Sequence, residues 1–332
     1  MKIPPIYTIT PEILELISKI EANRIFLSSI NIPLSLKDKI RRTNILKSAL
    51  FSARIEGNTL NLREVEQGES EERQRVEIFN ILRAYEFTDK NIKSGQTITK
   101  EIILNLHSKI MNNISGEKGV FRREMGAIFN QAGIAVCVAP PPEKIKYLIG
   151  ELLSYVNSDL EKFPLLSAFV FHLVFEKIHP FVDGNGRLGR LLIFTILKIR
   201  DQNFNSGLPF EEYLDEHRND YYYFLEKGLV EINDYLIFML EAFYHATEKL
   251  KELVEKELAK KETVFLPPRQ EEIYNIVKDH RLVSFDQIRR RFLKVPERTL
   301  RYDLKKLTDA KLIIKIGETK GSFYRISEEI HD

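Results

Sequence analysis

Apolar residues recur at helical spacing along most of this 332-residue chain. Residues three and four apart fall on one face of an α-helix, so such runs predict amphipathic helices. Pro142 and Pro164 stand where the first turn of a helix tolerates proline. The run that begins at Pro164 is apolar nearly all round, which is typical of a buried helix. In the first two thirds of the chain the pattern predicts helices over residues 35–56, 71–88, 99–112, 142–157, 164–178 and 187–200.

Two regions have a different pattern. Residues 126–138 are β-branched and punctuated by glycine, which predicts a β-hairpin between two of the helices. The second region follows Leu266-Pro267-Pro268, where prolines break a charged helix that spans residues 248–262. It predicts three helices and then two strands around a glycine-bearing turn, an order that resembles a winged helix-turn-helix. The predicted elements of this region are helices 270–278, 284–292 and 296–310 and a strand pair within 312–326.

The patterns together predict a mainly α protein, with a helical core that carries the hairpin and a smaller domain at the C-terminal end. The division that we expect is an N-terminal helical region at 1–95, a core at 96–247, a linker helix at 248–266 and a winged helix-turn-helix domain at 267–332.

Composition excludes several classes of protein. The formal net charge is +2, so the whole-chain balance indicates no particular partner. Cys137 is the only cysteine, which excludes a disulfide framework within the chain and suits a reducing cytoplasm. No run approaches the ~18 apolar residues that a membrane span needs, and the N-terminal residues do not form a secretory signal. We therefore expect a cytoplasmic protein with no membrane partner.

The strongest local signal is the segment HPFVDGNGRLGR at residues 179–190. Pro180 ends the preceding apolar helix, and the glycines of residues 183–186 allow a sharp turn in which backbone approaches a ligand closely. A second helix follows that turn. Free N–H groups and the positive end of the helix dipole point outward at such a helix start, which favours an anion.

Four side chains in this segment add chemistry to the predicted anion site. Arg187 and Arg190 lie three apart on one helical face and offer guanidinium groups suited to phosphate. Asp183 places a carboxylate where a divalent metal that bridges phosphates would bind. His179 is the group suited to proton abstraction near neutral pH. The residues alone therefore predict phosphoryl or nucleotidyl transfer.

The whole segment resembles the signature H-P-F-x-D/E-G-N-G-R-x-x-R of the Fic (filamentation induced by cAMP) family, and it meets every fixed position. The resemblance implies a Fic-type helical core with a hairpin flap that pairs with an extended segment of the target protein. It implies transfer of AMP from ATP to protein hydroxyls, with His179 deprotonating the hydroxyl and Asp183 coordinating Mg²⁺. The nucleotide-binding residues that it implies are Gly184, Asn185, Gly186, Arg187 and Arg190, the last of them at the γ-phosphate.

A second segment, SARIEGN at residues 52–58, is similar to the inhibitory helix of this family. Ser52 and Glu56 are four apart on one face of a predicted helix, and Gly57 stands where helices end. The resemblance implies that Glu56 pairs with Arg190 and competes with the γ-phosphate of ATP. The chain is then autoinhibited in its resting state.

The C-terminal domain is basic. Residues 269–325 contain 15 Lys or Arg against 8 Asp or Glu, a local net charge of +7. In a winged helix-turn-helix, Arg298, Arg301 and Lys305 lie on the recognition helix and Lys320 lies in the wing, where they would contact DNA. A protein-binding or dimerisation module with a solvated basic face is the other interpretation of the same residues.

Our interpretation is a protein adenylyltransferase that uses ATP and Mg²⁺ to modify Ser, Thr or Tyr of protein substrates. Two alternatives remain open: a DNA-binding regulator or adaptor whose Fic core senses a nucleotide, and an enzyme whose net reaction removes AMP. Further candidate partners are the chain itself through self-modification, DNA through residues 269–325, and a second copy in a homodimer.

Overall fold

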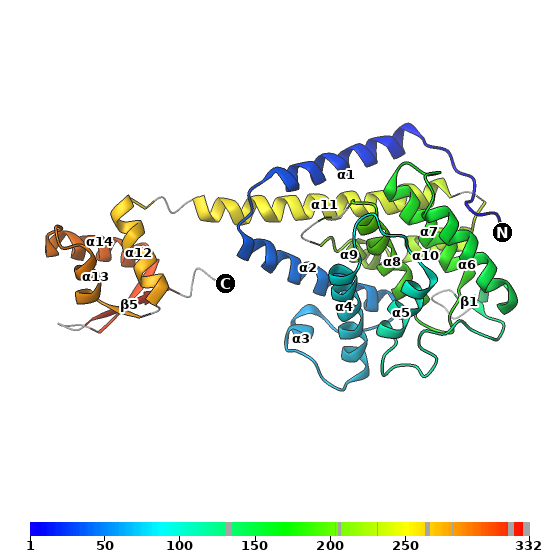
Figure 1. The fold of residues 1–332 in the computed structure, drawn as a ribbon, viewed down its shortest axis with the longest axis horizontal. Coiled ribbons are helices and arrows are strands. Elements are labelled where there is room, and N and C mark those ends of the chain that lie inside the picture. The colour runs from blue at the N-terminus through cyan, green and yellow to red at the C-terminus, as the bar shows by residue number, and fades with distance from the viewer. Residues whose placement is uncertain are drawn as a thin grey trace. The chain divides into compact units, whose positions relative to one another are not determined.

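The computed structural model describes residues 1–129, 135–202, 204, 207–230, 232–262, 266–280, 282–317 and 322–327 (Figure 1). The chain divides into two compact units, Met1–Glu255 and Lys256–Asp332. None of the helices in these ranges combines the length and the apolar run that a membrane crossing requires.

The first unit begins with two long helices, α1 (Pro11–Ser29) and α2 (Leu34–Ile55). The Thr10 side chain accepts a hydrogen bond from the backbone N–H of Ile13, which caps the start of α1. Helix α1 lies along α11 (Asn233–Glu262), where Asn23 Nδ2 donates to Thr247 Oγ1 at 3.1 Å (Figure 1). Two further helices follow, α3 (Leu62–Glu66) and α4 (Arg73–Asn91).

The core of this unit forms around α7 (Pro164–Ile178), which packs against α6 (Pro142–Val156) and α8 (Asn185–Ile199). Every residue of α7 after Pro164 is buried, which confirms the prediction of a helix enclosed on all sides. Each fully buried large apolar side chain contributes about 1.5–3 kcal/mol to the free energy of unfolding. The C-terminal end of α7 and the N-terminal end of α8, which carry the segment 179–190, are therefore held on rigid supports.

Helix α2 belongs to the same core. It packs against α4, α8 and α9 (Glu211–Glu216), and its buried face includes Ser48, Ser52 and Ile55. The remaining helices of the unit are α5 (Lys100–Ile110) and α10 (Arg218–Lys227). The C-terminal end of α2 thus lies beside the start of α8, although more than a hundred residues separate the two in the sequence.

The predicted hairpin is present as strands β1 (Ala127–Phe129) and β2 (Ala135–Val138). The strands are antiparallel, Ala127 pairs with Val138, and an irregularity in the register falls after Ile128. Residues 130–134, which complete the predicted hairpin, lie outside the described residues.

Helix α11 differs from the prediction. The charged helix was expected to begin near residue 248, but it begins at Asn233. No proline or glycine interrupts residues 233–262, and the apolar stripe of Leu236, Met239 and Phe243 is buried in the first unit. The boundary between the two compact units falls inside α11, after Glu255. The four-part division of the chain stays a prediction.

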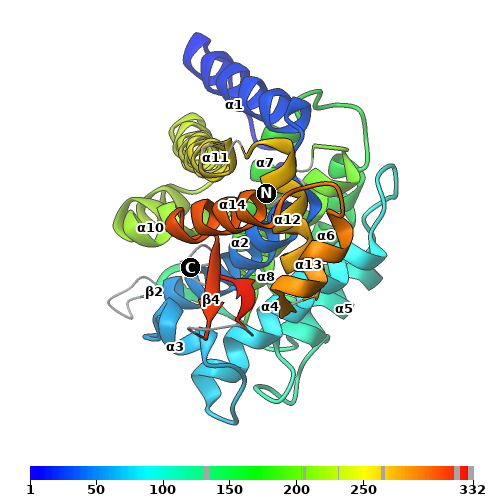
Figure 2. The same cartoon turned by 90° about the vertical axis from the view of Figure 1, so that its left-hand side faces the viewer.

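After the end of α11, the described residues of the second unit form three helices and a small sheet (Figure 2). The sheet has the order β3-β5-β4, and both pairings are antiparallel. Ile273, Leu300, Leu304 and Tyr324 are among the residues of its core. The order of three helices and a terminal strand pair is the predicted one, whereas the short strand β3 was not predicted. The elements are α12 (Pro268–His280), β3 (Val283–Ser284), α13 (Phe285–Arg291), α14 (Glu297–Asp309), β4 (Ile313–Ile316) and β5 (Phe323–Ile326).

Candidate active site

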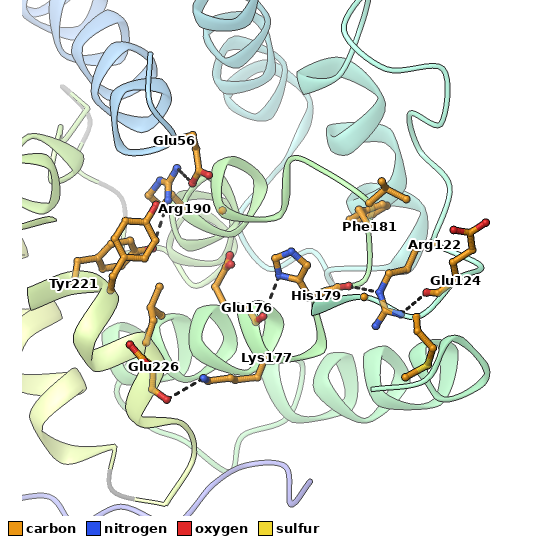
Figure 3. A pocket seen from close by; sticks show the side chains of 16 residues that line it. Glu56, Arg122, Glu124, Glu176, Lys177, His179, Phe181, Arg190, Tyr221 and Glu226 are labelled. Carbon is orange, nitrogen blue, oxygen red and sulfur yellow. Dashed lines mark hydrogen bonds and ion pairs between the residues drawn. The ribbon is translucent and has the colours of Figure 1, made fainter. Parts of the chain in front are cut away.

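The loop between α7 and α8 has two residues in the left-handed region of backbone space. His179 follows α7 with φ 47° and ψ 61°, and Gly184 precedes α8 with φ 83°. A left-handed conformation costs a residue with a side chain roughly 1–2 kcal/mol, so the surrounding contacts must hold His179 in place. The reversal at His179 ends α7 and directs the imidazole into a cavity (Figure 3).

Asn185 fastens this loop to itself. Its Oδ1 accepts from the Phe181 N–H at 3.0 Å, and its Nδ2 donates to the Phe181 carbonyl at 2.9 Å. The side chain is 2% exposed and is committed to these two bonds. The family resemblance placed Asn185 among the nucleotide-binding residues. In this arrangement its side chain bonds the loop, and its backbone N–H remains available to a ligand.

A buried histidine on α5, His107, contacts the loop between α7 and α8. The ring of His107, on α5, stacks on Phe181 with 3.6 Å between centroids. Its Nδ1 accepts from the Gly119 N–H at 2.8 Å, so Nε2 carries the proton and donates to the Asp183 carbonyl at 2.9 Å. Burial lowers the pKa of His107 to about 4, which keeps this tautomer at neutral pH. The sequence analysis did not find His107, because no local pattern distinguishes it from other helix residues.

His179 is arranged to accept a proton. Its Nδ1 lies 3.3 Å from the Glu176 carbonyl oxygen (Figure 3). A carbonyl can only accept, so Nδ1 carries the hydrogen and Nε2 presents its lone pair. Burial is the main cause that lowers the pKa of His179, and the ring is accordingly neutral at pH 7.

Arg190 is 1% exposed and is held by α2 on one side and α10 on the other (Figure 3). Its Nε donates to Ser52 Oγ at 3.0 Å and its Nη2 donates to the Ser52 carbonyl at 2.8 Å. Nη2 also lies 2.8 Å from Glu56 Oε1, and Nη1 lies 3.5 Å from the Tyr221 hydroxyl. The structure therefore brings Ser52, Glu56 and Arg190 together, as the resemblance implied.

Glu56 caps the C-terminal end of α2, and its side chain is 30% exposed. Gly57 follows it with φ 100°, a conformation that glycine adopts without strain. The Glu56 carboxylate also covers Gly186 at the start of α8, since a Cβ on Gly186 would come within 2.2 Å of Glu56 Oε1. The carboxylate thus occupies the place beside the helix N-terminus that favours an anion.

The first arginine of the loop motif is already paired. Arg187 Nη1 donates to a carboxylate oxygen of Glu77 on α4, and Arg187 Nη2 donates to Asp183 Oδ1 at 2.6 Å. Glu77 also accepts from Asn58 Nδ2 at 2.9 Å, which links the end of the SARIEGN segment to the same network. Glu77 was not singled out from the sequence. Arg187 and Arg190 were treated alike there, but their partners differ. Arg187 pairs with Glu77 and Asp183, whereas Arg190 pairs with Glu56.

The surroundings of Asp183 fit a metal ion that is bound jointly by the protein and a phosphate ligand better than one that is bound by protein side chains alone. Its Oδ1 accepts from the Gly184 N–H at 2.6 Å and from Arg187, while the side chain is about half exposed. Among the residues that the structure describes, no group of three or more His, Cys, Asp or Glu side chains could enclose a metal ion. One carboxylate with phosphate oxygens and water is, however, an ordinary ligand set for Mg²⁺.

These groups line a cavity of about 610 Å³ (Figure 3). Such a volume is in the range of nucleotide and cofactor pockets. The lining includes Glu56, Glu176, His179, Arg190, Tyr221 and Tyr222. A neutral histidine with a free lone pair and a buried cation therefore face one space, with the start of α8 between them.

Glu176 is an uncharged acid in the wall of this cavity. Its Oε1 lies 3.9 Å from His172 Nε2 and finds no hydrogen-bond partner within the described ranges. Burial raises the pKa of Glu176 to about 8, and burial lowers the pKa of His172 to about 3. Both groups are therefore neutral at pH 7, which avoids an unpaired buried charge next to Arg190.

Comparison with known proteins decides the family. A profile of the Fic/DOC family matches residues 97–197, a span that begins before α5, includes the whole loop and ends within α8. Over this span the chain belongs to the Fic/DOC family.

Curated relatives share the Fic core. The chain is 28% identical over 222 residues to the protein adenylyltransferase Fic of Drosophila willistoni, an alignment that covers 63% of this chain and 42% of the fly protein. It is 30% identical over 187 residues to the protein of the same name from Drosophila yakuba, which covers 53% of this chain and 35% of the relative. The chain thus spans about two fifths or less of the length of these relatives.

Solved structures share the fold. A Fic family protein from Desulfovibrio desulfuricans superimposes with a TM-score of 0.71 at 25% identity, over 97% of this chain and 98% of that chain. Residues 134–508 of Fic-1 from Caenorhabditis elegans superimpose with a TM-score of 0.62 at 20% identity, over 74% of this chain and 73% of that chain. The bacterial match includes the second unit, whereas the nematode match covers a smaller part of the chain.

The candidate DNA-binding residues belong to the second unit of the chain. Arg298, Arg301 and Lys305 are exposed along α14, and the guanidinium of Arg301 lies over the ring of Phe285 at 3.9 Å. Lys320 lies outside the described residues.

Proposed function

We propose that this chain is a protein adenylyltransferase that transfers AMP from ATP to hydroxyl groups of Ser, Thr or Tyr side chains. The observation that carries the proposal is the pairing of Glu56 with Arg190 in the same cavity as a proton-accepting His179. The names of the fly relatives support the reaction class.

In the proposed reaction the oxygen of the target hydroxyl attacks the α-phosphorus of ATP. The hydroxyl proton passes to His179 Nε2, the bond from the α-phosphorus to its bridging oxygen breaks, and pyrophosphate leaves. A positioned general base contributes typically 10²–10⁴-fold to the rate of such a step. The neutral state of His179 supports this role, because a protonated ring could not take the hydroxyl proton.

The polyphosphate is assigned to the start of α8 and to Arg190. The backbone N–H groups of the first turn, from Asn185 to Arg187, have no partners within the helix and carry the positive end of its dipole. Arg190 is assigned to the γ-phosphate. Arg187 is assigned to the loop that surrounds the triphosphate, which it holds through Asp183. Asp183 would hold Mg²⁺, which neutralises charge on the phosphate oxygens when it is bound.

Autoinhibition is part of the proposal. Glu56 and the γ-phosphate are both anions. Arg190 keeps its positive charge, so the two anions compete for its guanidinium. Ser52 supports this reading because its hydroxyl and carbonyl orient the guanidinium toward Glu56. Gly57 supports it because it ends α2 directly after the carboxylate. ATP bound beside Glu56 would have its γ-phosphate displaced from Arg190 and its α-phosphate out of line for attack.

The experiment uses purified protein carrying Glu56→Gly, incubated with ATP that is radiolabelled either at the α-position or at the γ-position. Label on protein from α-labelled ATP alone supports AMP transfer. Label from γ-labelled ATP would indicate phosphoryl transfer instead. Absence of label from both would contradict the proposal and would favour the nucleotide-sensor alternative. Mass spectrometry of a lysate treated in the same way would identify protein targets and show whether the chain modifies itself.

AMP removal is a second candidate reaction, favoured by the position of Glu56 on the wall of the same cavity as His179. A carboxylate there could orient a water molecule toward an AMP–protein bond. Incubation of labelled AMP–protein, made with the Glu56→Gly variant, with wild-type protein tests this candidate. Release of AMP that is lost with Glu56→Gln would support removal as the net reaction, and stable label would exclude it.

DNA binding by the second unit is a further candidate, carried by the exposed row Arg298, Arg301 and Lys305 on α14. Phosphate contacts release counterions, so the affinity should fall steeply as salt rises. Fluorescence anisotropy with a duplex of random sequence at low and moderate salt tests it, with the pair Arg298→Ala and Lys305→Ala compared with Lys278→Ala on α12. No binding at low salt would leave a protein-binding module or a homodimer contact, which light scattering would distinguish.

A further inference from the structure

Arg122 lies at the foot of the hairpin and connects three parts of the chain by hydrogen bonds to backbone carbonyls. Its Nε donates to the His179 carbonyl at 2.8 Å (Figure 3). Its Nη1 donates to the Glu124 carbonyl at 2.8 Å, and its Nη2 donates to the Pro140 carbonyl at 2.6 Å. The side chain is 5% exposed, so these bonds are shielded from water.

The first part is the strained residue at the end of α7. The left-handed backbone of His179 needs contacts on both sides, and its N–H donates to the Phe175 carbonyl while its carbonyl accepts from Arg122. The backbone N–H of Arg122 also donates to the carbonyl of Pro180 at 2.9 Å. Arg122 thus donates to two consecutive backbone carbonyls, those of the proposed base His179 and of Pro180.

The other two parts are the arms of the hairpin. Glu124 precedes β1 and Pro140 follows β2, so one guanidinium holds both arms at their base. The arms are closed by the Ala139 N–H, which donates to the Gly126 carbonyl at 3.0 Å. Gly126 leaves the space that Arg122 fills, because a Cβ there would lie 3.2 Å from Arg122 Nε.

The positive charge of Arg122 also affects the protonation of His179. Burial and, to a smaller extent, the Arg122 cation lower the pKa of His179. The carbonyl of Glu176 and the carboxylates of Glu56 and Asp183 raise it. Arg122 therefore favours the neutral imidazole of His179, whereas the carboxylates of Glu56 and Asp183 favour the protonated one.

We propose that Arg122 is a positioning residue for the transfer reaction, which fixes the backbone of His179 and ties both arms of the hairpin to it. This inference rests on the proposed function. A target segment that pairs with the hairpin would, through Arg122, be placed in register with the group that takes its hydroxyl proton.

The test compares Arg122→Gln and Arg122→Lys, each in a Glu56→Gly background, with the exposed neighbour Arg123→Gln as the matched control. The kinetic arm measures the rate of self-labelling at saturating α-labelled ATP, together with the Kd for ATP. We expect both Arg122 variants to label at least about tenfold more slowly, since misplacement of a reacting group by 1 Å costs on that order or more. The Kd for ATP should stay within about twofold, because Arg122 touches no residue assigned to the phosphates.

The second arm follows the His179 imidazole by NMR as pH is varied. The pKa of His179 should rise in Arg122→Gln and stay near that of the parent in Arg122→Lys, which keeps the charge but not the fork of donors. Labelling within twofold of the parent in Arg122→Gln would overturn the proposal. Equal losses of ATP affinity and Tm in both variants would also overturn it, by indicating general unfolding. If the Glu56→Gly parent transfers no AMP, the proposed function fails. In that case the NMR arm still tests the positioning role, because His179 resonances in Arg122→Gln that equal those of the parent would refute it.

Discussion

The Glu56 carboxylate and the α-carbon of Gly186 are in direct contact. A Cβ on Gly186 would lie 2.2 Å from Glu56 Oε1 and 3.1 Å from Arg190 Nη1. Real side chains do not approach so closely, so a side chain at this position would displace the Glu56 carboxylate from the place that it occupies beside Arg190. Gly186, the last residue of the D-G-N-G turn, therefore serves the resting state as well as the anion site.

Gly186→Ala should lower the Tm, because the added methyl group pushes the Glu56 carboxylate away from Arg190. Overpacking of this kind costs typically 1–3 kcal/mol. In a Glu56→Gly background the same substitution should cost clearly less, since the carboxylate is no longer there. Thermal unfolding of the four proteins gives the coupling between the two sites. Gly150→Ala on α6 is the control, because a Cβ there meets no atom within 4 Å. Equal losses of Tm in both backgrounds would contradict the contact.

Glu56→Gly should raise AMP transfer well above that of the wild type, because Arg190 becomes available to the γ-phosphate. The variant should also have a lower Tm without ATP, since a buried guanidinium has lost its partner. Saturating ATP should raise the Tm of the variant by more than that of the wild type. Thermal shift assays and labelling with α-labelled ATP measure both effects.

Glu56→Gln separates charge from helix propensity in that comparison. It keeps the size of the side chain at the end of α2 and removes the charge, so it should activate as well, though less than Glu56→Gly. If wild-type protein already labels as fast as either variant, Glu56 is not inhibitory.

His179→Ala in the Glu56→Gly background should abolish transfer and leave the Kd for ATP within about twofold, because the imidazole acts on the hydroxyl and not on the phosphates. Labelling and equilibrium dialysis measure the two quantities. His107→Ala is an informative contrast. It removes the ring that stacks on Phe181 and bonds the Asp183 carbonyl, so it should weaken ATP binding and lower the Tm. Transfer by the His179→Ala protein at the parent's rate would remove the histidine from the mechanism.

Glu176→Gln should stabilise the protein more at about pH 8 than at about pH 5. The pKa of Glu176 is raised by burial to about 8 in the folded state, against an ordinary value of 4.5 for a glutamate carboxyl. The folded state therefore holds a proton that the unfolded state releases, and the free energy of unfolding falls as pH rises through this window. The difference is on the order of a few kcal/mol. Thermal unfolding across the pH range measures it, with the exposed Glu143→Gln as control, and a Tm difference that is independent of pH would contradict the buried acid.

The sequence predicted what local pattern determines. The buried character of α7 follows from a run of apolar residues, and the loop after it follows from Pro180 and the glycines at 184 and 186. The mainly α fold with its β-hairpin and the resemblance to the Fic family were confirmed, whereas the winged helix-turn-helix stays a prediction. The pairing of Ser52 and Glu56 with Arg190 bridges more than 130 positions, and only the family resemblance suggested it.

The sequence could not reveal the residues that act through tertiary packing. His107, Glu77 and Arg122 come from α5, α4 and the loop before β1, and each is a single polar residue in an ordinary local context. Asn185 shows the converse, because its motif position was recognised but its side chain bonds the loop rather than facing the cavity. Only the three-dimensional arrangement distinguishes a polar side chain that supports the loop from one that faces the ligand.

The double hold of Ser52 on Arg190 has a kinetic consequence. Ser52 bonds two nitrogens of the guanidinium through its hydroxyl and its carbonyl, neither of which depends on Glu56. Departure of the carboxylate therefore requires rotation of one side chain about its own bonds, and no displacement of α2. Such rotations take place in picoseconds to nanoseconds at exposed positions, whereas enzymes of ordinary speed turn over in milliseconds or longer. We expect the two states to interconvert many times within each catalytic cycle, so that the activity at a given ATP concentration reports an equilibrium constant and shows no lag.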